Sequence, residues 1–428
     1  MKINAYSTGM CIYRSCVNTF FALGGLNFLK RKYSDITERT GQVSGIPENA
    51  LWIHAVSVGE VQSASSLIRR IKSRSAYRCI LSTVTPTGRD MAHNLLDGMA
   101  DKIIYSPFDS RKYVSRALDA IKPAAYIAME TELWPEMLSQ LKARNIPAFL
   151  ANGRISDKSF SRMRRTKYFW HGVFECLDKL MVRFESDKNK FLALGVPEHK
   201  LAITGDCKVD ALLDRRKNTS PEKWQWLKSG DSPLIAAGST HPGEDDIVIA
   251  AFRILRETCP DARLVIVPRH PERALMTVAS ALPYSDLHAE LLSHVDRDNL
   301  NADIVVVDRI GVLFELYAVC DAVFIGGSLV DKGGQNPFEP ALFGVPAIHG
   351  PSMTDFPDTP RMDAMGAGII VNNATELARA WGEALRPLAR RKALKDCSAY
   401  FGTLGGAAER TWSEIELGIL NEKGREPV

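Results

Sequence analysis

The chain has 428 residues, 45% of them hydrophobic and 24% charged, with 30 Gly, 22 Pro and 8 Cys. This composition excludes a disordered, collagen-like or disulfide-stapled protein, and the length predicts two or three domains with cores of their own. The 54 basic and 50 acidic side chains give a net charge of +4, too balanced for a general nucleic-acid coat, so we expect no nucleic-acid partner. The cysteines form no C-x-x-C pair, which predicts neither a metal nor a redox motif and suits a reduced, cytosolic setting.

Residues 1–40 carry the whole basic excess, with six basic and two acidic side chains. The charge-free stretch 15–29 ends at Lys30-Arg31-Lys32, and its fifteen residues fall short of the roughly 20 that a spanning helix needs. No small-x-small cleavage site follows, which argues against a signal peptide. We therefore predict a basic, apolar segment at 1–40 that lies on an anionic membrane surface. The alternative is a helix that packs on its own domain.

Beyond residue 50 the chain alternates short β-branched runs with amphipathic stretches, which predicts βαβ units and parallel sheets covered on both faces. The expected strands are 51–56, 79–84, 102–105, 125–129, 148–152, 180–183, 201–205, 233–238, 263–268, 303–308, 321–326, 346–350 and 368–371. The fold prediction is α/β, with two Rossmann-like domains facing across a cleft. We expect a first domain at 41–210, a polar linker at 211–232, a second domain at 233–400 and a helical tail at 401–428.

Ligands of such sheets bind beyond the carboxyl ends of the strands, so the residues that follow each strand matter most. In the first half Glu60 follows a strand, and it is suited either to act as a general base or to cap the next helix. Two more acids, Glu130 and Glu132, follow another strand, and carboxylates that converge on a crevice are costly unless they bind hydroxyls, cations or protons. Lys208 is a candidate for an anionic substrate; the alternative is a solvated linker lysine.

The second half carries features of an anion site. The turn 238–244 opens a helix expected at 245–258, and its free backbone N–H groups suit a phosphate. Arg269 ends another strand with a guanidinium group. Asn336 and Pro337 are predicted as the N-cap and first residue of a helix, in which Glu339 accepts the hydroxyls of a ribose. No clustered acidic motif suggests a divalent cation.

Taken together, the motifs resemble those of the bacterial 3-deoxy-D-manno-octulosonic acid (Kdo) transferases over about residues 50–410. They are HAVSVGE (54–60), TPTG (85–88), METELWP (129–135), NGRIS (152–156), GDCKVD (205–210), STHPGE (239–244), VPRHPER (267–273) and GGSLVDKGGQNPFEP (326–340). The resemblance implies a GT-B fold and inverting, metal-independent transfer of Kdo from CMP-Kdo to a tetraacyl, bis-phosphorylated lipid A precursor (lipid IVA) in lipopolysaccharide synthesis. It also implies no cofactor, and a place at the cytoplasmic face of the inner membrane, peripheral or N-terminally anchored.

The resemblance makes Glu60 the general base, with Glu130 and Lys208 supporting the transition state. Ser57 and Gly59 are candidates for acceptor binding. Where the family often has Met-Gly-Glu, this chain has Ile310-Gly311-Val312, which retains the backbone contact but not the acid. The residues predicted to bind the nucleotide sugar are Ser239, Thr240, Pro268, Arg269, Ile310, Gly311, Val312, Gly327, Ser328, Asn336, Pro337, Phe338 and Glu339.

Residues 158–174 hold five basic and several aromatic side chains and no acid. This pattern favours a phosphorylated lipid at a membrane interface, with Arg162, Arg164 and Arg165 as acceptor-binding candidates. The alternative is a solvated helix face whose apolar side packs in the core.

Three other functions remain open at this point. The first is a transferase or epimerase that uses a UDP-sugar on the same fold. The second is a non-catalytic nucleotide-binding module that tethers a complex to the membrane. The third, a dehydrogenase, is the weakest because no G-x-G-x-x-G follows the first strand of either half.

Overall fold

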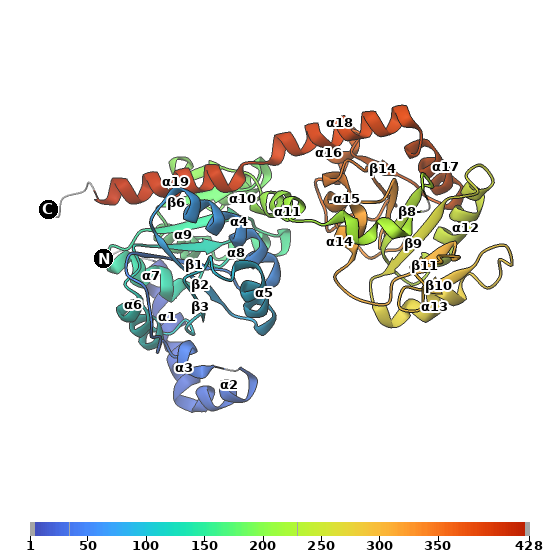
Figure 1. Ribbon diagram of the computed structural model, residues 1–428. Coiled ribbons are helices and arrows are strands. Elements are labelled where there is room, and N and C mark those ends of the chain that lie inside the picture. Colours follow the sequence, from blue (N-terminus) through green and yellow to red (C-terminus); the bar gives the residue numbers. More distant parts are fainter. Residues whose placement is uncertain (1–4, 34, 229, 424–428) are drawn as a thin grey trace. The chain divides into compact units, whose positions relative to one another are not determined.

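The computed structural model describes residues 5–33, 35–228 and 230–423. The chain forms two compact units, one with the described residues up to Ala211 and from Leu404 onwards, the other Leu212–Thr403 (Figure 1). The chain passes between the units inside two helices, α11 (Cys207–Lys217) and α18 (Pro387–Leu404). The predicted linker at 211–232 therefore differs from the structure, in which α11 and a helical turn at Pro221–Leu227 occupy most of that range.

Unit 1 is built on a parallel sheet of seven strands in the order β3-β2-β1-β4-β5-β6-β7. The strands are β1 (Ala50–His54), β2 (Arg78–Thr83), β3 (Lys102–Tyr105), β4 (Ala125–Met129), β5 (Ala148–Gly153), β6 (Lys179–Val182) and β7 (Leu201–Ile203). The connecting helices are α4 (Val58–Arg74), α5 (Pro86–Leu96), α6 (Arg111–Ile121), α7 (Pro135–Ala143), α8 (Asp157–Arg165), α9 (Lys167–Phe174) and α10 (Glu185–Ala193). All seven strands predicted for this half are present.

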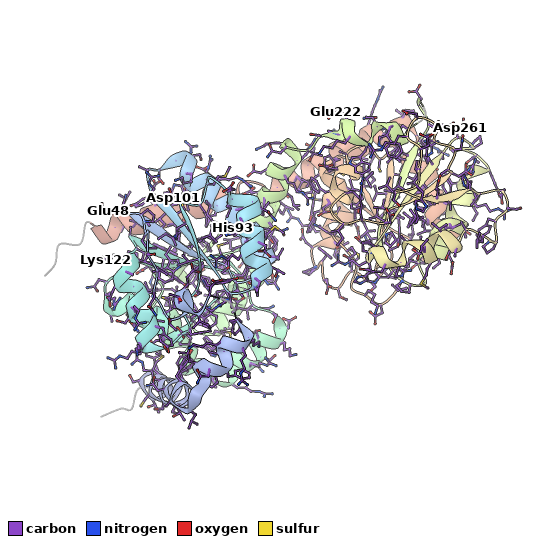
Figure 2. All side chains as sticks on the ribbon, turned by 60° about the horizontal axis from the view of Figure 1, so that its bottom comes forward. Glu48, His93, Asp101, Lys122, Glu222 and Asp261 are labelled. Atoms are coloured by element: carbon purple, nitrogen blue, oxygen red, sulfur yellow. The ribbon has the colours of Figure 1, made fainter. Side chains whose placement is uncertain are left out.

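Successive residues of a strand face opposite sides of the sheet, so both faces of this sheet are apolar. Trp52 of β1 belongs to one core cluster, while its neighbours Leu51 and Ile53 belong to the other. The Asp101 carboxylate, just before β3, accepts the Cys79 N–H of β2 at 2.8 Å and pairs with Lys72 at 2.9 Å. Asp101 is labelled in Figure 2.

Both ends of the chain take part in unit 1. Helix α19 (Ala407–Lys423) buries Trp412, Ile415 and Ile419 in the second core cluster, so this segment is part of the first unit and not the separate tail predicted at 401–428. Helix α1 (Ala5–Phe20) packs against α9 and continues through a kink at Phe21–Gly25 into α2 (Leu26–Lys32), followed by α3 (Ile36–Arg39).

Unit 2 repeats the plan with a parallel sheet in the order β10-β11-β9-β8-β12-β13-β14. Its strands are β8 (Leu234–Thr240), β9 (Arg263–Pro268), β10 (Ala289–Leu291), β11 (Ile304–Val306), β12 (Ala322–Ile325), β13 (Ala347–His349) and β14 (Gly368–Ile370). The helices are α12 (Asp245–Arg256), α13 (Ala274–Ala279), α14 (Leu313–Tyr317), α15 (Phe338–Leu342), α16 (Thr359–Ala364), α17 (Ala374–Ala384) and α18. Among the described strands, the short edge strand β10 is the one that the sequence did not predict, because its sequence Ala-Glu-Leu contains no β-branched residue.

Candidate functional site

The candidate site of unit 1 lies where the strand order reverses. β1 and β4 are hydrogen-bonded neighbours whose connections leave in opposite directions, which is the position at which doubly wound sheets bind ligands. Glu60 comes from the turn after β1, and Glu130 is the first residue after β4. The topology therefore brings these two predicted carboxylates to the same edge.

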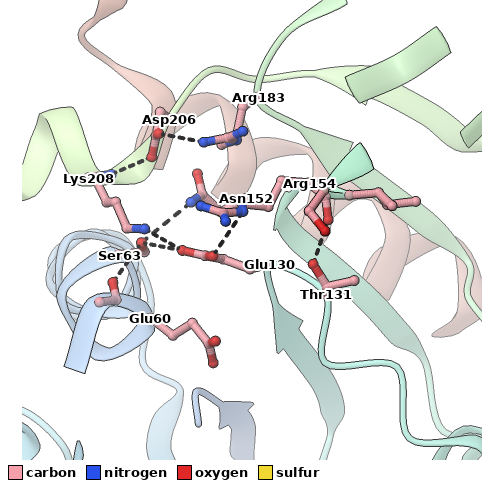
Figure 3. Close-up of polar contacts among 12 residues, drawn as sticks. Glu60, Ser63, Glu130, Thr131, Asn152, Arg154, Arg183, Asp206 and Lys208 are labelled. Carbon is pink, nitrogen blue, oxygen red and sulfur yellow. Dashed lines mark hydrogen bonds and ion pairs between the residues drawn. The ribbon is translucent and has the colours of Figure 1, made fainter. Parts of the chain in front are cut away.

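Glu130 is 7% exposed, and its charge is compensated by two cations. Its Oε1 lies 2.7 Å from the Lys208 Nζ, and its Oε2 lies 3.5 Å from the Arg154 Nε (Figure 3). Ser63 adds a long hydrogen bond of 3.5 Å from its hydroxyl to Oε1. The backbone of Glu130 has φ +52°, a left-handed conformation that costs a non-glycine residue roughly 1 kcal/mol or more. Such strain is typical of functional sites.

Lys208 is held toward Glu130 by its surroundings. Its backbone N–H donates to the Asp206 Oδ1 at 2.9 Å, and Arg183 binds the other oxygen of Asp206 at 3.4 Å. Gly59 lies beside the ammonium group, since a Cβ there would be in ordinary contact with the Lys208 Nζ at 3.7 Å. The interpretation of Lys208 as a solvated linker lysine is therefore wrong, since it is paired with a buried carboxylate.

Glu60 lies in the first turn of α4, and its carboxylate points away from Lys208 in Figure 3. Its Oε2 accepts the backbone N–H of Val56 at 2.5 Å. Burial raises the pKa of Glu60, and the negative charge of Glu130 adds to this effect, whereas the Val56 N–H opposes it. The two interpretations of Glu60 are compatible: one oxygen caps the strand-to-helix turn, and the raised pKa makes the group a better proton acceptor.

Glu132 was not among the predicted site residues, although it is the second acid of the METELWP motif. Burial and the charges of Glu60 and Glu130 raise the pKa of Glu132 to about 7. Its Oε2 accepts the Trp134 Nε1–H at 2.9 Å and lies 4.0 Å from the Nε2 of His54. Burial lowers the pKa of His54 to about 4, and this Nε2 has no hydrogen-bond partner among the described residues. A strand followed by two acids was the signal that could have identified Glu132.

In unit 2 the strand order reverses between β8 and β12, where the predicted turn 238–244 meets a second turn at 326–328, directly after β12. The carboxylate of Glu244, which is fully buried, lies at this point. Its carboxylate accepts the backbone N–H groups of His241 (2.9 Å), Gly327 (2.6 Å), Ser328 (3.0 Å) and Leu329 (3.0 Å).

The amides of Gly327 and Ser328 were predicted to bind the nucleotide sugar, and the structure uses them for this internal bond instead. The Ser328 hydroxyl is also engaged, because it donates to the Ile325 carbonyl and accepts the Gly350 N–H at 2.8 Å. These amides are occupied because the Glu244 side chain, which lies directly before α12, is long enough to reach both turns. Gly326 allows the two turns to lie this close together, because a Cβ at this position would meet the Ser239 carbonyl oxygen at 2.4 Å.

Basic side chains gather beside the Glu244 carboxylate. Arg269 is exposed at the end of β9, one residue after the buried Pro268. Burial lowers the pKa of His241, the negative charge of Glu244 opposes this effect, and the nearby His270, Lys332 and Arg269 add to the lowering. Arg273 of the same motif is instead occupied by Asp245.

Two predicted residues lie at the end of β8. Ser239 has φ +57°, and the hydroxyl of the buried Thr240 has no hydrogen-bond partner among the described residues.

The other predicted nucleotide-binding residues lie in two loops of unit 2. The Asn336 Oδ1 accepts the Phe338 N–H at 3.1 Å, and α15 begins at Phe338, one residue later than predicted. Burial raises the pKa of Glu339, whose Oε1 accepts from the Asn336 Nδ2 at 3.3 Å. In the second loop Ile310 is 84% exposed, Gly311 has φ +92° and Val312 precedes α14.

The basic segment 158–174 has the exposed helix face and packed apolar side of the alternative interpretation, while its interpretation as a lipid-binding segment stays a prediction. Arg162, Arg164 and Arg165 are exposed on α8, whereas Met163 is buried and Phe169 packs against the core. The same holds for the N-terminal segment, in which Met10 is buried while the exposed apolar side chains are Ile12, Phe20, Leu23 and Phe28. Within the described residues, no helix is long and apolar enough to cross a membrane, and no three His, Cys, Asp or Glu side chains are grouped as metal ligands would be.

Two doubly wound parallel sheets, each with polar groups at the reversal of its strand order, define the GT-B class of glycosyltransferase folds. Solved structures agree with this fold. A UDP-GlcNAc 2-epimerase from Neisseria meningitidis has a TM-score of 0.59 and 15% identity, and covers 87% of this chain and 100% of that one. A glycosyltransferase from Rickettsia africae has a TM-score of 0.57 and 14% identity over 87% of this chain and 99% of that one.

Sequence relatives define the family. A family model described as 3-deoxy-D-manno-octulosonic-acid transferase (kdotransferase) matches residues 34–211. A 3-deoxy-D-manno-octulosonic acid transferase from Haemophilus influenzae is 33% identical over 338 residues, which are 78% of this chain and 78% of that protein. The chain belongs to the 3-deoxy-D-manno-octulosonic acid (Kdo) transferase family, as the resemblance of its motifs predicted.

Proposed function

We propose that this protein transfers Kdo from CMP-Kdo to a tetraacyl, bis-phosphorylated lipid A precursor, in lipopolysaccharide synthesis, with inversion at the anomeric carbon and without a metal ion. The observation that carries the proposal is the difference between two neighbouring carboxylates. Glu130 is neutralised by Lys208 at 2.7 Å, whereas Glu60 accepts a backbone N–H and has a raised pKa. The first is suited to hold charge in place and the second to accept a proton.

The proposed step is a single displacement. The acceptor hydroxyl oxygen forms a bond to the anomeric carbon of Kdo while the bond from that carbon to the CMP phosphate oxygen breaks. Glu60 takes the hydroxyl proton, and the electron pair of the broken bond leaves with CMP. Attack on the side opposite the leaving group inverts the anomeric centre.

The groups proposed to bind the CMP part of the sugar donor lie in unit 2. Arg269, with Lys332 and His270, supplies positive charge for the phosphate of CMP, and the carboxyl of Glu339 is suited to accept ribose hydroxyls. Lys208 is 33% exposed in its side chain although it is ion-paired, so it retains donors for the carboxylate of Kdo. These assignments need no divalent cation, and activity unchanged by EDTA is the expected result.

We place the protein at the cytoplasmic face of the inner membrane. The support is the row of exposed apolar side chains from Ile12 to Phe28, which ends at the cations Lys30, Arg31 and Lys32. Arg162, Arg164 and Arg165 add charge for the phosphates of the acceptor. Replacing these three by Ser is expected to weaken binding to anionic liposomes by about tenfold or more at low salt. Unchanged binding would contradict the assignment.

The direct test is a transfer assay. The purified protein is mixed with the tetraacyl, bis-phosphorylated acceptor and with CMP-Kdo made in situ, and the lipid products are weighed. A mass increase by one or more Kdo units is expected, together with thermal stabilisation by CMP in preference to UMP or UDP. Stabilisation by UDP alone, with no lipid product, would refute the proposal.

A further inference from the structure

A pocket of about 370 Å³ in unit 1 borders the catalytic loop and has no place in the function described so far. Its walls come from three segments: Tyr13 of α1, the loop from Thr131 to Pro135, and Phe169 with Trp170 of α9. The lining is mainly apolar and aromatic and includes one carboxyl group, that of Glu132. Its volume falls in the range of small-molecule sites.

The wall contributed by α1 is fixed by a buried polar network. The Tyr13 hydroxyl donates to the Asp109 Oδ2 at 2.7 Å, and Asp109 accepts the backbone N–H groups of Glu136 (3.0 Å) and Met137 (2.8 Å). Arg14 donates to the Glu136 Oε2 at 2.7 Å. Glu136 and Met137 are in the first turn of α7, directly after the loop that carries Glu130 and Glu132. Helix α1 is therefore hydrogen-bonded, through Asp109 and Glu136, to the start of α7 and forms one wall of the pocket.

The chemistry of the pocket points to an apolar occupant. Phe169 and Trp170 face it beside Leu133 and Trp134, and a chain buried among such side chains is stabilised by roughly 0.8 kcal/mol for each CH₂ group. Glu132 interacts electrostatically with Glu60, so the pocket is near the proposed base and hence near the reacting hydroxyl. Burial raises the pKa of Glu132 to about 7, so its carboxyl tolerates an apolar neighbour better than an ordinary glutamate would.

Helix α8, which precedes α9, carries positive charge that is suited to the phosphates of a phosphorylated lipid. α8 exposes Arg162, Arg164 and Arg165, and the chain passes from α8 to α9 at Thr166. Cations for the phosphates and aromatic rings for the chain thus follow each other along one stretch of sequence.

We propose that the pocket between α1, the 131–135 loop and α9 is a subsite for one acyl chain of the lipid acceptor, and that α1 forms part of this subsite as well as a membrane contact. This inference rests on the proposed function, because it takes the acceptor to be an acylated sugar. It assigns Tyr13, Phe169 and Trp170 to acceptor specificity.

The test compares two acceptors that differ only in their acyl chains. Phe169→Gln and Trp170→Gln replace an aromatic ring of the wall by a smaller, polar side chain. Tyr168→Gln is the matched control, because Tyr168 is 69% exposed on the same helix and does not line this pocket. For the tetraacyl acceptor, kcat/KM is expected to fall about tenfold in the two pocket variants, and for the deacylated sugar bisphosphate less than about twofold. An equal fall on both acceptors overturns the proposal in favour of a sugar subsite, and no fall on either also overturns it.

Photo-crosslinking gives a readout that does not need turnover. A tetraacyl acceptor with a diazirine at an acyl terminus is expected to label peptides that contain Tyr13, Trp134 or Trp170. Labelling confined to other peptides overturns the proposal even if both variants lose their fold. If the wild-type protein labels the pocket but transfers no Kdo, the proposed function fails and the subsite stands.

Discussion

The two units share one sheet topology, but the edges at which their strand orders reverse are built differently. In unit 1 the edge carries side-chain carboxylates, of which Glu130 is paired with Lys208 and Glu60 is not. In unit 2 the edge carries backbone amides, and the buried Glu244 already occupies four of them. The same fold thus presents side-chain carboxylates in one unit and a turn of backbone amides in the other.

This difference has a physical origin. A carboxylate that must change its protonation state needs a local environment that destabilises its charge, as burial does for Glu60. A phosphate keeps its charge throughout, so it needs rigid donors, and the Glu244 bonds stiffen the loop beside Arg269 and Lys332. We therefore expect changes in unit 1 to lower kcat and changes in unit 2 to weaken donor binding.

The largest effect is expected from Glu60→Gln, which keeps the shape and cannot accept the proton. It should lower kcat by roughly 10²–10⁴-fold while CMP still raises the Tm. Glu48→Gln is the control, since Glu48 is an exposed carboxylate of the same unit (Figure 2). Near-normal turnover of a folded Glu60→Gln protein would show that another group is the base.

Lys208→Met should have the next largest effect, because it removes the closer of the two cations paired with the buried Glu130 and leaves Arg154, at 3.5 Å. We expect kcat to fall about 10²-fold and the free energy of unfolding to fall by roughly 2 kcal/mol. Adding Glu130→Gln removes the unpaired charge, so denaturant titration of the double variant should show restored stability while activity stays low. A double variant as unstable as Lys208→Met would mean that the pair is not coupled in this way.

Arg269→Met tests the other unit. Loss of one charge-assisted contact to phosphate should weaken CMP binding about tenfold, as measured by calorimetry, and should leave the pH dependence of kcat unchanged. Arg253→Met is a suitable control, because this arginine pairs with the exposed Asp286. Equal CMP affinity in wild type and Arg269→Met would remove Arg269 from the donor site.

The smallest effect is a shift in the acid limb of the pH profile. Glu60 must be ionised to act as a base, and its pKa is raised by burial, so kcat/KM should decline on acidification at a higher pH than an ordinary glutamate would give. Measuring kcat/KM from pH 4 to pH 8 in buffers of constant ionic strength tests this, with stability followed in parallel. An acid limb at the ordinary glutamate pKa would show that Glu60 is not desolvated.

The sequence predicted the sheets well, because parallel strands buried on both faces appear as short β-branched runs, and thirteen of the fourteen strands match these runs. It also predicted that Glu60, Glu130 and Lys208 follow strands: Glu130 comes directly after β4, and the other two lie in the first turns of α4 and α11. It could not show that Glu244 fills the turn at Gly327, because the partner lies 83 residues away in the chain. Nor could it show that α19 packs into the core of unit 1, since an apolar pattern such as that of Trp412 and Ile415 does not indicate which segment it packs against.

The most direct test of this division of labour is the CMP affinity of the Glu60→Gln protein measured beside that of Arg269→Met. We predict that Glu60→Gln binds CMP as the wild type does yet transfers Kdo roughly 10²–10⁴-fold more slowly, whereas Arg269→Met binds CMP about tenfold more weakly. A Glu60→Gln protein that loses CMP affinity as severely as Arg269→Met would contradict the assignment of proton transfer to unit 1 and donor binding to unit 2.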